Sequence, residues 1–207
     1  MRYVIAASLL AVSVATAAAA QDAPPENLAG TLAGFRVEGN LGWDKTHSLG
    51  QSNDRFGYGG SAGFDGNLTN QIVIGPEVSY WRPSKNRNQT SVPGVNGGTV
   101  VHEGREMWAA DIRIGYRVGP DLLVFGKGGY VNQAQRSYFN APAGQQGYAT
   151  RGRTDGYQVG GGVQFSPHDQ FSFVPANVYL SAQYVYSDFN NHTRDEHAMA
   201  GIGFRFR

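Results

Sequence analysis

Residues 108–116 read WAADIRIGY, with an aromatic residue at each end and an apolar residue at every second position between them. Eight steps along a β-strand rise about 26 Å, and a tilt of roughly 40° leaves about 20 Å of height between the two aromatic rings. This height matches the apolar belt of a membrane-spanning β-barrel, in which aromatic residues mark both water interfaces. The stretch therefore predicts one strand of such a barrel.

The same spacing recurs along the chain. Three further segments have an aromatic residue at both ends, and four more have one at a single end: 35–43, 56–64 and 157–165, then 72–80, 122–130, 178–186 and 198–206. The sequence thus predicts an all-β fold, an eight-stranded antiparallel up-and-down transmembrane β-barrel. The predicted girdles are the aromatic residues at the strand ends: Phe35, Trp43, Phe56, Phe64, Tyr80, Trp108, Tyr116, Tyr130, Tyr157, Phe165, Tyr186 and Phe206.

The two faces of these strands differ in composition. Every second residue of the eight segments gives forty positions, which carry only aromatic, aliphatic and glycine residues and a single proline. These positions predict the lipid-facing surface, and the alternate positions predict a polar interior. A soluble β-sandwich also alternates, but its outer faces would be polar and it would need no aromatic residues at fixed heights. The predicted interior charge network consists of seven residues: Arg36, Glu38, Glu77, Asp111, Arg113, Lys127 and Arg205.

The N-terminus and the composition agree with export. Residues 1–20 combine Arg2, an apolar stretch and a run of alanines, which is the pattern of a signal peptide. A retained helical anchor is the alternative, but it usually needs roughly 20 apolar residues. We expect a periplasmic tail over 21–32 and one barrel domain over 33–207. The chain has no cysteine, which excludes thiolate metal sites, and its net charge of +1 gives no reason to expect a nucleic-acid partner.

The connections alternate in length. Tight turns are predicted at 67–70 and 119–121, with a longer turn at 166–177, whereas the opposite end has four long loops: 44–54, 82–105, 132–154 and 187–195. Bacterial barrels have short periplasmic turns and longer external loops, so we expect both termini in the periplasm and the location to be the outer membrane. The external loops hold most of the exposed basic residues, which either contact lipopolysaccharide phosphates or are simply solvated: Lys85, Arg87, Arg105, Arg136, Arg151 and Arg153.

Four segments in the second half carry a family resemblance: 122–130 (LLVFGKGGY), 156–163 (GYQVGGGV), 178–184 (VYLSAQY) and 201–206 (GIGFRF). The chain resembles the small outer-membrane β-barrel family of Gram-negative bacteria, which includes opacity-type and OmpA-type transmembrane barrels and related porin-family proteins. The resemblance implies insertion by the barrel assembly machinery through the last strand, and a role in envelope integrity, surface contact or weak pore activity. One departure is that Arg207 follows the terminal aromatic Phe206.

The sequence contains no recognisable catalytic arrangement. The interior serines Ser61, Ser79 and Ser181 have no histidine at a similar height on a neighbouring strand, so we expect no enzymatic activity. His192, Asp195 and His197 are a conceivable metal site, but such a cluster is more often a solvated loop rim, and we expect neither a metal nor a cofactor. Residues 125–128 fit a strand rather than a phosphate-binding loop.

The filling of the barrel interior determines whether the barrel is closed or forms a pore. Eight strands enclose a space that side chains can just fill, and opposite charges such as Asp111 and Lys127 on adjacent strands should pair. Inward glycines leave room either for water or for larger side chains to pack across. We expect a closed lumen, and hence a monomeric, non-enzymatic barrel that contributes to envelope integrity and displays four loops to an unknown surface ligand. The alternative is a narrow porin for ions or very small solutes.

Overall fold

The strands of the chain form a single closed sheet. The computed structural model describes residues 33–48, 51–84, 90–93, 99–119, 121–141, 146–169, 171, 173–190 and 193–206. The predicted signal peptide and the predicted tail over 21–32 lie outside these residues. Within them, no helix is both long and apolar enough to cross a membrane. The strands that form the barrel are β1 Gly34–Ser48, β2 Gln51–Asn67, β3 Ile72–Pro83, β5 Thr99–Arg117, β6 Leu122–Asn140, β7 Ala149–Phe165, β8 Val178–Phe189 and β9 Arg194–Phe206.

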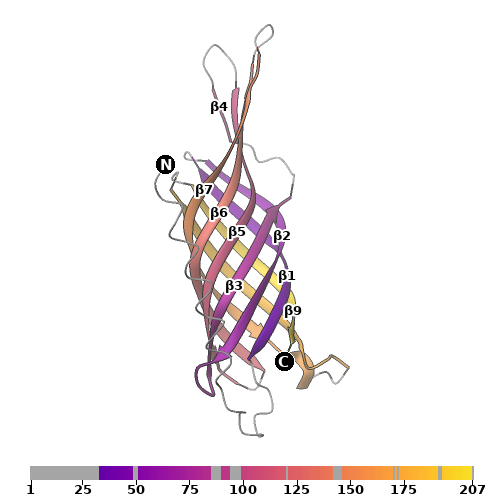
Figure 1. Ribbon diagram of the computed structural model, residues 1–207. Coiled ribbons are helices and arrows are strands. Elements are labelled where there is room, and N and C mark those ends of the chain that lie inside the picture. Colours follow the sequence, from indigo (N-terminus) through magenta and orange to yellow (C-terminus); the bar gives the residue numbers. More distant parts are fainter. Residues whose placement is uncertain are drawn as a thin grey trace. The chain divides into compact units, whose positions relative to one another are not determined.

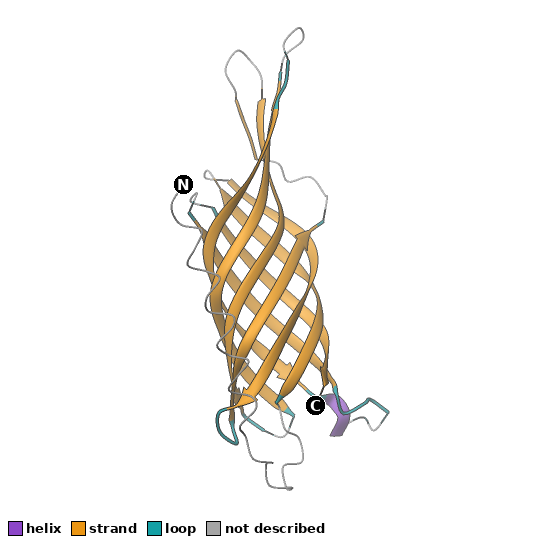
Figure 2. Cartoon of the chain, viewed as in Figure 1, coloured by secondary structure: helices purple, strands orange, loops and turns teal. Residues whose placement is uncertain are grey.

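Each of these strands pairs antiparallel with its neighbours, in the order β3-β2-β1-β9-β8-β7-β6-β5. The pairing of β3 with β5 closes the ring, so the described residues form an eight-stranded antiparallel barrel (Figure 2). The predicted fold is therefore confirmed. The first and last strands meet along β1 and β9, where Phe35 lies opposite Phe206 and Asp44 lies opposite His197.

The barrel has two unlike ends. We call the end with the β2–β3, β5–β6 and β7–β8 connections the turn end, and the opposite end the loop end. At the turn end, the Thr69 hydroxyl accepts hydrogen bonds from the Gln71 and Ile72 amides, which closes the first turn tightly. The longer third connection contains a short 3-10 helix, η3 Pro167–Asp169. The loop end carries the four remaining connections.

Strands continue well past the expected strand ends at the loop end, so the predicted loop bounds are wrong. β6 runs to Asn140 and β7 begins at Ala149, although 132–154 was expected to be a loop. The short strand β4 Thr90–Pro93 pairs with β5 inside the loop expected at 82–105. Figure 1 shows these upper segments rising beyond the rest of the barrel. The aromatic spacing measures the height of an apolar belt, whereas strand length is set by backbone pairing between neighbours.

The outer surface of the barrel is apolar, whereas the inner surface carries the buried charged side chains together with an apolar layer. On β5, Ile112 is 54% exposed, whereas the adjacent Arg113 is 2% exposed. Aromatic side chains meet across neighbouring strands near both ends, with ring centroids 5.9 Å apart for Trp43 and Phe56 and 6.1 Å apart for Phe35 and Phe206. Alternation at period two thus places the girdle aromatics and the interior charges on opposite faces of the wall.

Candidate functional site

The lumen toward the turn end is organised around the buried carboxylate of Asp65. Arg113 donates to Asp65 over 2.8 Å, and Arg36 and Arg205 each form an ion pair with it at 3.2 Å. Gln164 accepts a second hydrogen bond from Arg113, over 2.7 Å. One carboxylate therefore links guanidinium groups from three other strands, which holds the barrel wall together from inside.

Glu77 forms the second centre of the network. Its two carboxylate oxygens accept from Arg36 over 2.6 Å and from Lys127 over 2.7 Å. The expected pairing of Lys127 with Asp111 is wrong, because Asp111 instead accepts a hydrogen bond of 2.6 Å from Gln158. The register explains the difference. Lys127 lies opposite Arg113 rather than Asp111, and its long side chain reaches past β5 to the neighbouring strand β3.

Polar side chains fill the middle of the lumen. Glu38 accepts hydrogen bonds from Ser181 over 2.8 Å and from Gln183 over 3.2 Å. With Glu38 and Asp111 included, the four acidic groups here balance the four basic groups: Glu38, Asp65, Glu77 and Asp111 against Arg36, Arg113, Lys127 and Arg205. All seven predicted network residues thus lie inside the barrel, but the network also depends on Asp65.

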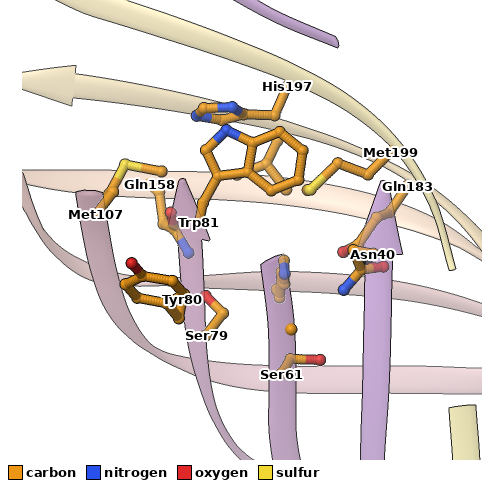
Figure 3. Close-up of a pocket in the computed structure, with 13 residues that line it drawn as sticks. Asn40, Ser61, Ser79, Tyr80, Trp81, Met107, Gln158, Gln183, His197 and Met199 are labelled. Carbon is orange, nitrogen blue, oxygen red and sulfur yellow. Dashed lines mark hydrogen bonds between the residues drawn. The ribbon is translucent and has the colours of Figure 1, made fainter. Parts of the chain in front are cut away.

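An apolar layer follows toward the loop end. Trp81, Met107, Ala109, Val131 and Phe189 are buried together, and Met199 packs against them. Trp81 lies over the glycine wall of β2, where a methyl group built on Gly57 would overlap its ring. Figure 3 shows Trp81 between Met107 and Met199, with His197 stacked edge-on at 5.4 Å between ring centroids. The inward glycines Gly57 and Gly59 make room for this large ring.

A small cavity lies between the polar middle and this apolar layer (Figure 3). It has a volume of about 20 Å³ and is lined by residues that include Asn40, Ser61, Lys127, Gln158 and Trp81. A volume of this size holds about one water molecule.

Charged residues lie on the loop-end side of the apolar layer. The expectation that the cluster around Asp195 and His197 is a solvated loop rim is wrong. Asp44, Asp195 and His197 are all buried, and Asp44 forms an ion pair with Arg55 at 3.2 Å. Asp195 accepts a hydrogen bond of 2.6 Å from Gln133. Asp44 had been assigned to a loop and His192 lies outside the described residues, so the cluster that forms differs from the predicted set.

Four interior residues that the sequence analysis does not include share one property. Asp65, Asp44, Arg55 and Trp81 each lie one position beyond an end of the predicted segments, on the inward phase of their strands. The sequence does carry a signal for them, because the two-residue alternation continues past the aromatic residues at the predicted strand ends.

The outer face of the β6–β7 hairpin carries a polar ladder above the loop-end girdle. Tyr130 lies opposite Tyr157, and the next outward pairs are Asn132 with Asp155, Ala134 with Arg153, and Arg136 with Arg151. The Tyr130 hydroxyl donates to Asp155, the Asn132 amide donates to the same carboxylate over 2.6 Å, and Arg153 donates to Asn132 over 2.6 Å. The pairing of Arg136 with Arg151 sets two cations side by side.

Lys85 and Arg87 lie outside the described residues, and Arg105 is paired with Glu106 at 3.6 Å.

The chain is similar to known outer-membrane barrels in sequence and in fold. The family model described as outer membrane protein beta-barrel domain matches residues 4–206. No curated protein matches the chain. The crystal structure of Ail, the attachment invasion locus protein of Yersinia pestis, has a TM-score of 0.58 at 15% identity and covers 84% of this chain and 100% of that chain. The crystal structure of Neisserial surface protein A has a TM-score of 0.52 at 17% identity and covers 83% and 97%. At these identities the solved structures show a shared fold.

Proposed function

Because the chain belongs to the family of outer membrane protein β-barrel domains, we propose that it is a non-enzymatic, monomeric barrel that supports envelope integrity by binding lipopolysaccharide. In this proposal the loop end faces the outside and both termini face the periplasm, since bacterial barrels have short periplasmic turns. The rigid, filled barrel is the scaffold, and the loop-end strands are the contact surface.

The observation that carries this proposal is the ladder above Tyr130 and Tyr157. Arg153 and Arg151 are exposed on the same face of the wall as the lipid-facing girdle, four and six residues beyond Tyr157 respectively. Those separations correspond to heights of roughly 10 and 15 Å above the girdle for a strand tilted by about 40°. Cations at these heights lie at the level of the headgroups, where lipopolysaccharide carries its phosphates.

The charge arrangement also favours an anion. Arg136 and Arg151 are directly opposite each other, and like charges in this position destabilise a strand pair. A phosphate between the two guanidinium groups would reverse the repulsion and accept hydrogen bonds from both. The Yersinia pestis protein Ail has been crystallised with the heparin analogue sucrose octasulfate, so a polyanion binds a barrel of this fold.

The lumen supports a scaffold rather than an enzyme or a porin. The interior hydroxyls of Ser181 and Ser187 donate to Glu38 and Gln158, so neither is activated by a histidine. The ion network and the Trp81 layer fill the space that a narrow pore would need. The exposed apolar residues Ile202, Phe204 and Phe206 of β9 are what the assembly machinery would recognise in the last strand.

Thermal unfolding in lipid vesicles tests the lipopolysaccharide contact. The refolded barrel is expected to unfold at a higher temperature in vesicles that contain lipopolysaccharide than in phosphatidylcholine alone. The double variant Arg136→Gln, Arg151→Gln should lose most of this increase, whereas Arg117→Gln at the turn end should retain it. The proposal fails if the double variant keeps the full increase, or if dephosphorylated lipopolysaccharide stabilises the wild type equally.

A further inference from the structure

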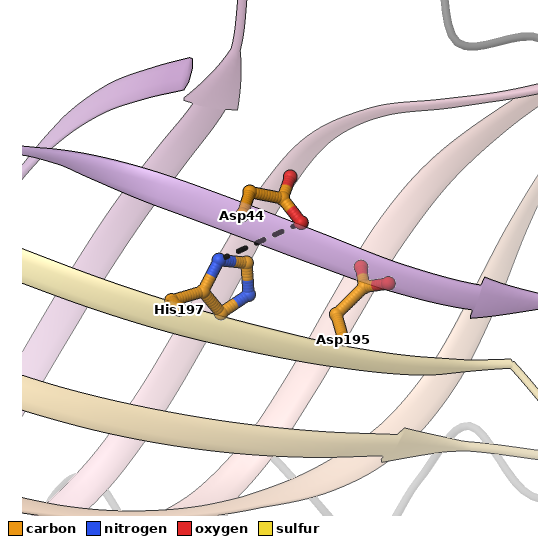
Figure 4. Close-up of side chains that lie close together, drawn as sticks. All are labelled: Asp44, Asp195 and His197. Atoms are coloured by element: carbon orange, nitrogen blue, oxygen red, sulfur yellow. Dashed lines mark ion pairs between the residues drawn. The ribbon is translucent and has the colours of Figure 1, made fainter. Parts of the chain in front are cut away.

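The buried cluster at the loop end joins the two strands that close the barrel. Asp44 is on β1, and Asp195 and His197 are on β9, with Asp44 opposite His197 and Thr46 opposite Asp195 in the strand register. One potential ligand atom from each of the three residues lies within 4.8 Å of the other two. Figure 4 shows the imidazole of His197 turned toward Asp44, with the Asp195 carboxylate beside them.

Within this cluster, His197 is left without any hydrogen-bond partner. It is 1% exposed, and neither of its ring nitrogens has a hydrogen-bond partner. Its Nδ1 lies 3.9 Å from the nearest Asp44 oxygen, which is too far for a hydrogen bond. A buried imidazole without a partner is unfavourable, so a group that accepts its lone pair would stabilise this arrangement.

The two carboxylates are each held by a donor on one oxygen. Arg55 donates to Oδ2 of Asp44 over 3.2 Å, and Gln133 donates to Oδ2 of Asp195 over 2.6 Å. Oδ1 of Asp195 accepts no hydrogen bond, and Oδ1 of Asp44 accepts one of 3.3 Å from the Thr46 hydroxyl. Metal-ligating carboxylates are commonly oriented in this way, by outer donors that leave one oxygen directed at the ion.

We propose that this cluster binds one divalent transition-metal ion of the zinc type. Zinc takes imidazole nitrogen and carboxylate oxygen together, whereas calcium and magnesium prefer all-oxygen sites. When both carboxylates are ionised, their charge together with that of Arg55 is −1, which attracts a cation. Ligand atoms around tetrahedral zinc lie ~3.3 Å apart, so the three side chains close in on the ion when it binds.

The position gives the ion a mechanical role. It bridges β1 and β9, which pair with each other although they lie at opposite ends of the described sequence. An ion bound only by the folded barrel stabilises the closed state against opening at this strand pair. Three protein ligands also leave a fourth position for water.

Zinc titration of the refolded, chelator-treated barrel in detergent tests the proposal. Calorimetry is expected to show one zinc ion per barrel, and zinc should raise the temperature at which the barrel unfolds. His197→Gln should weaken binding by more than the roughly 10–100-fold that loss of an outer donor costs. His47→Gln is the matched control, because His47 is a partly exposed histidine 3.9 Å from Glu196 on the neighbouring strand. This control should bind zinc as the wild type does.

Two results would overturn the site. One is a wild-type barrel that takes up no zinc at micromolar concentration. The other is zinc binding that survives His197→Gln but is lost in His47→Gln, which would place the ion on the surface. If His197→Gln does not fold, the zinc-edge X-ray absorption spectrum of the wild-type complex decides the matter. It is expected to show one imidazole among oxygen ligands, and a shell of oxygen alone contradicts the proposal.

Discussion

Two regions of the lumen, the charged region around Asp65 and Glu77 and the apolar layer around Trp81, are filled by opposite means. Toward the turn end, Asp65 and Glu77 connect four cations from different strands. Toward the loop end, Trp81 and its neighbours fill the space by shape against a glycine wall. The charged region depends on each partner being present, because an unpaired buried charge is costly, whereas the apolar layer depends on volume. The same barrel wall is therefore held by two kinds of interaction that respond differently to substitution.

Removal of the Asp65 carboxylate should have the largest effect. Asp65→Ala leaves Arg36, Arg113 and Arg205 without their common partner and should lower the free energy of unfolding by about 3–5 kcal/mol. Urea unfolding in lipid vesicles measures this loss. Asp188→Ala is the control, since Asp188 accepts only a 3.3 Å hydrogen bond from Tyr157 at the rim, and its loss should stay below about 1 kcal/mol. Equal losses for both variants would show that the network does not hold the wall.

Truncation of Trp81 should have a smaller effect on stability but a larger one on conductance. Trp81→Ala removes the ring that covers Gly57, and we expect a loss of about 3 kcal/mol, at the low end for a buried tryptophan because water can enter the space. In planar bilayers the variant should conduct more than the wild type. If the Trp81→Ala barrel conducts no ions, the barrier to ion passage lies instead in the charged region around Asp65 and Glu77.

Extra volume in the same apolar layer should also lower the free energy of unfolding. Gly57→Ala forces a methyl group against the Trp81 ring and should cost about 1–3 kcal/mol. The double variant with Trp81→Leu should recover part of that loss, because the smaller side chain leaves room for the methyl group. Strictly additive losses would mean that the two residues are not in contact.

Neutralising Asp111 should have the smallest effect. Asp111→Asn keeps the hydrogen-bonding shape toward Gln158 and removes a carboxylate that lies opposite Glu77. We expect a change below about 1 kcal/mol in the free energy of unfolding. A loss as large as that of Asp65→Ala would restore the direct Asp111–Lys127 pair that the sequence suggested.

The strand number and the two faces were predictable because both follow from period-two alternation over segments of fixed length. The inward position of Arg113 and Lys127 was predictable, because both residues fall inside those segments. Asp65, Asp44 and Trp81 were missed because the aromatic spacing was taken as the end of each strand. The partners of Lys127 were beyond sequence reasoning, since they depend on strand stagger and on how far a side chain reaches across the lumen. The buried state of His197 likewise depends on Trp81, which is distant in sequence.

We expect the charged network and the Trp81 layer together to close the barrel to ions. Single-channel recording of the refolded wild-type protein in planar bilayers tests this most directly. The wild-type membrane should be nearly silent, with openings that become frequent only when Trp81 or the Asp65 network is removed. Steady open channels in the wild type would contradict it, and would make the narrow porin the better description of this protein.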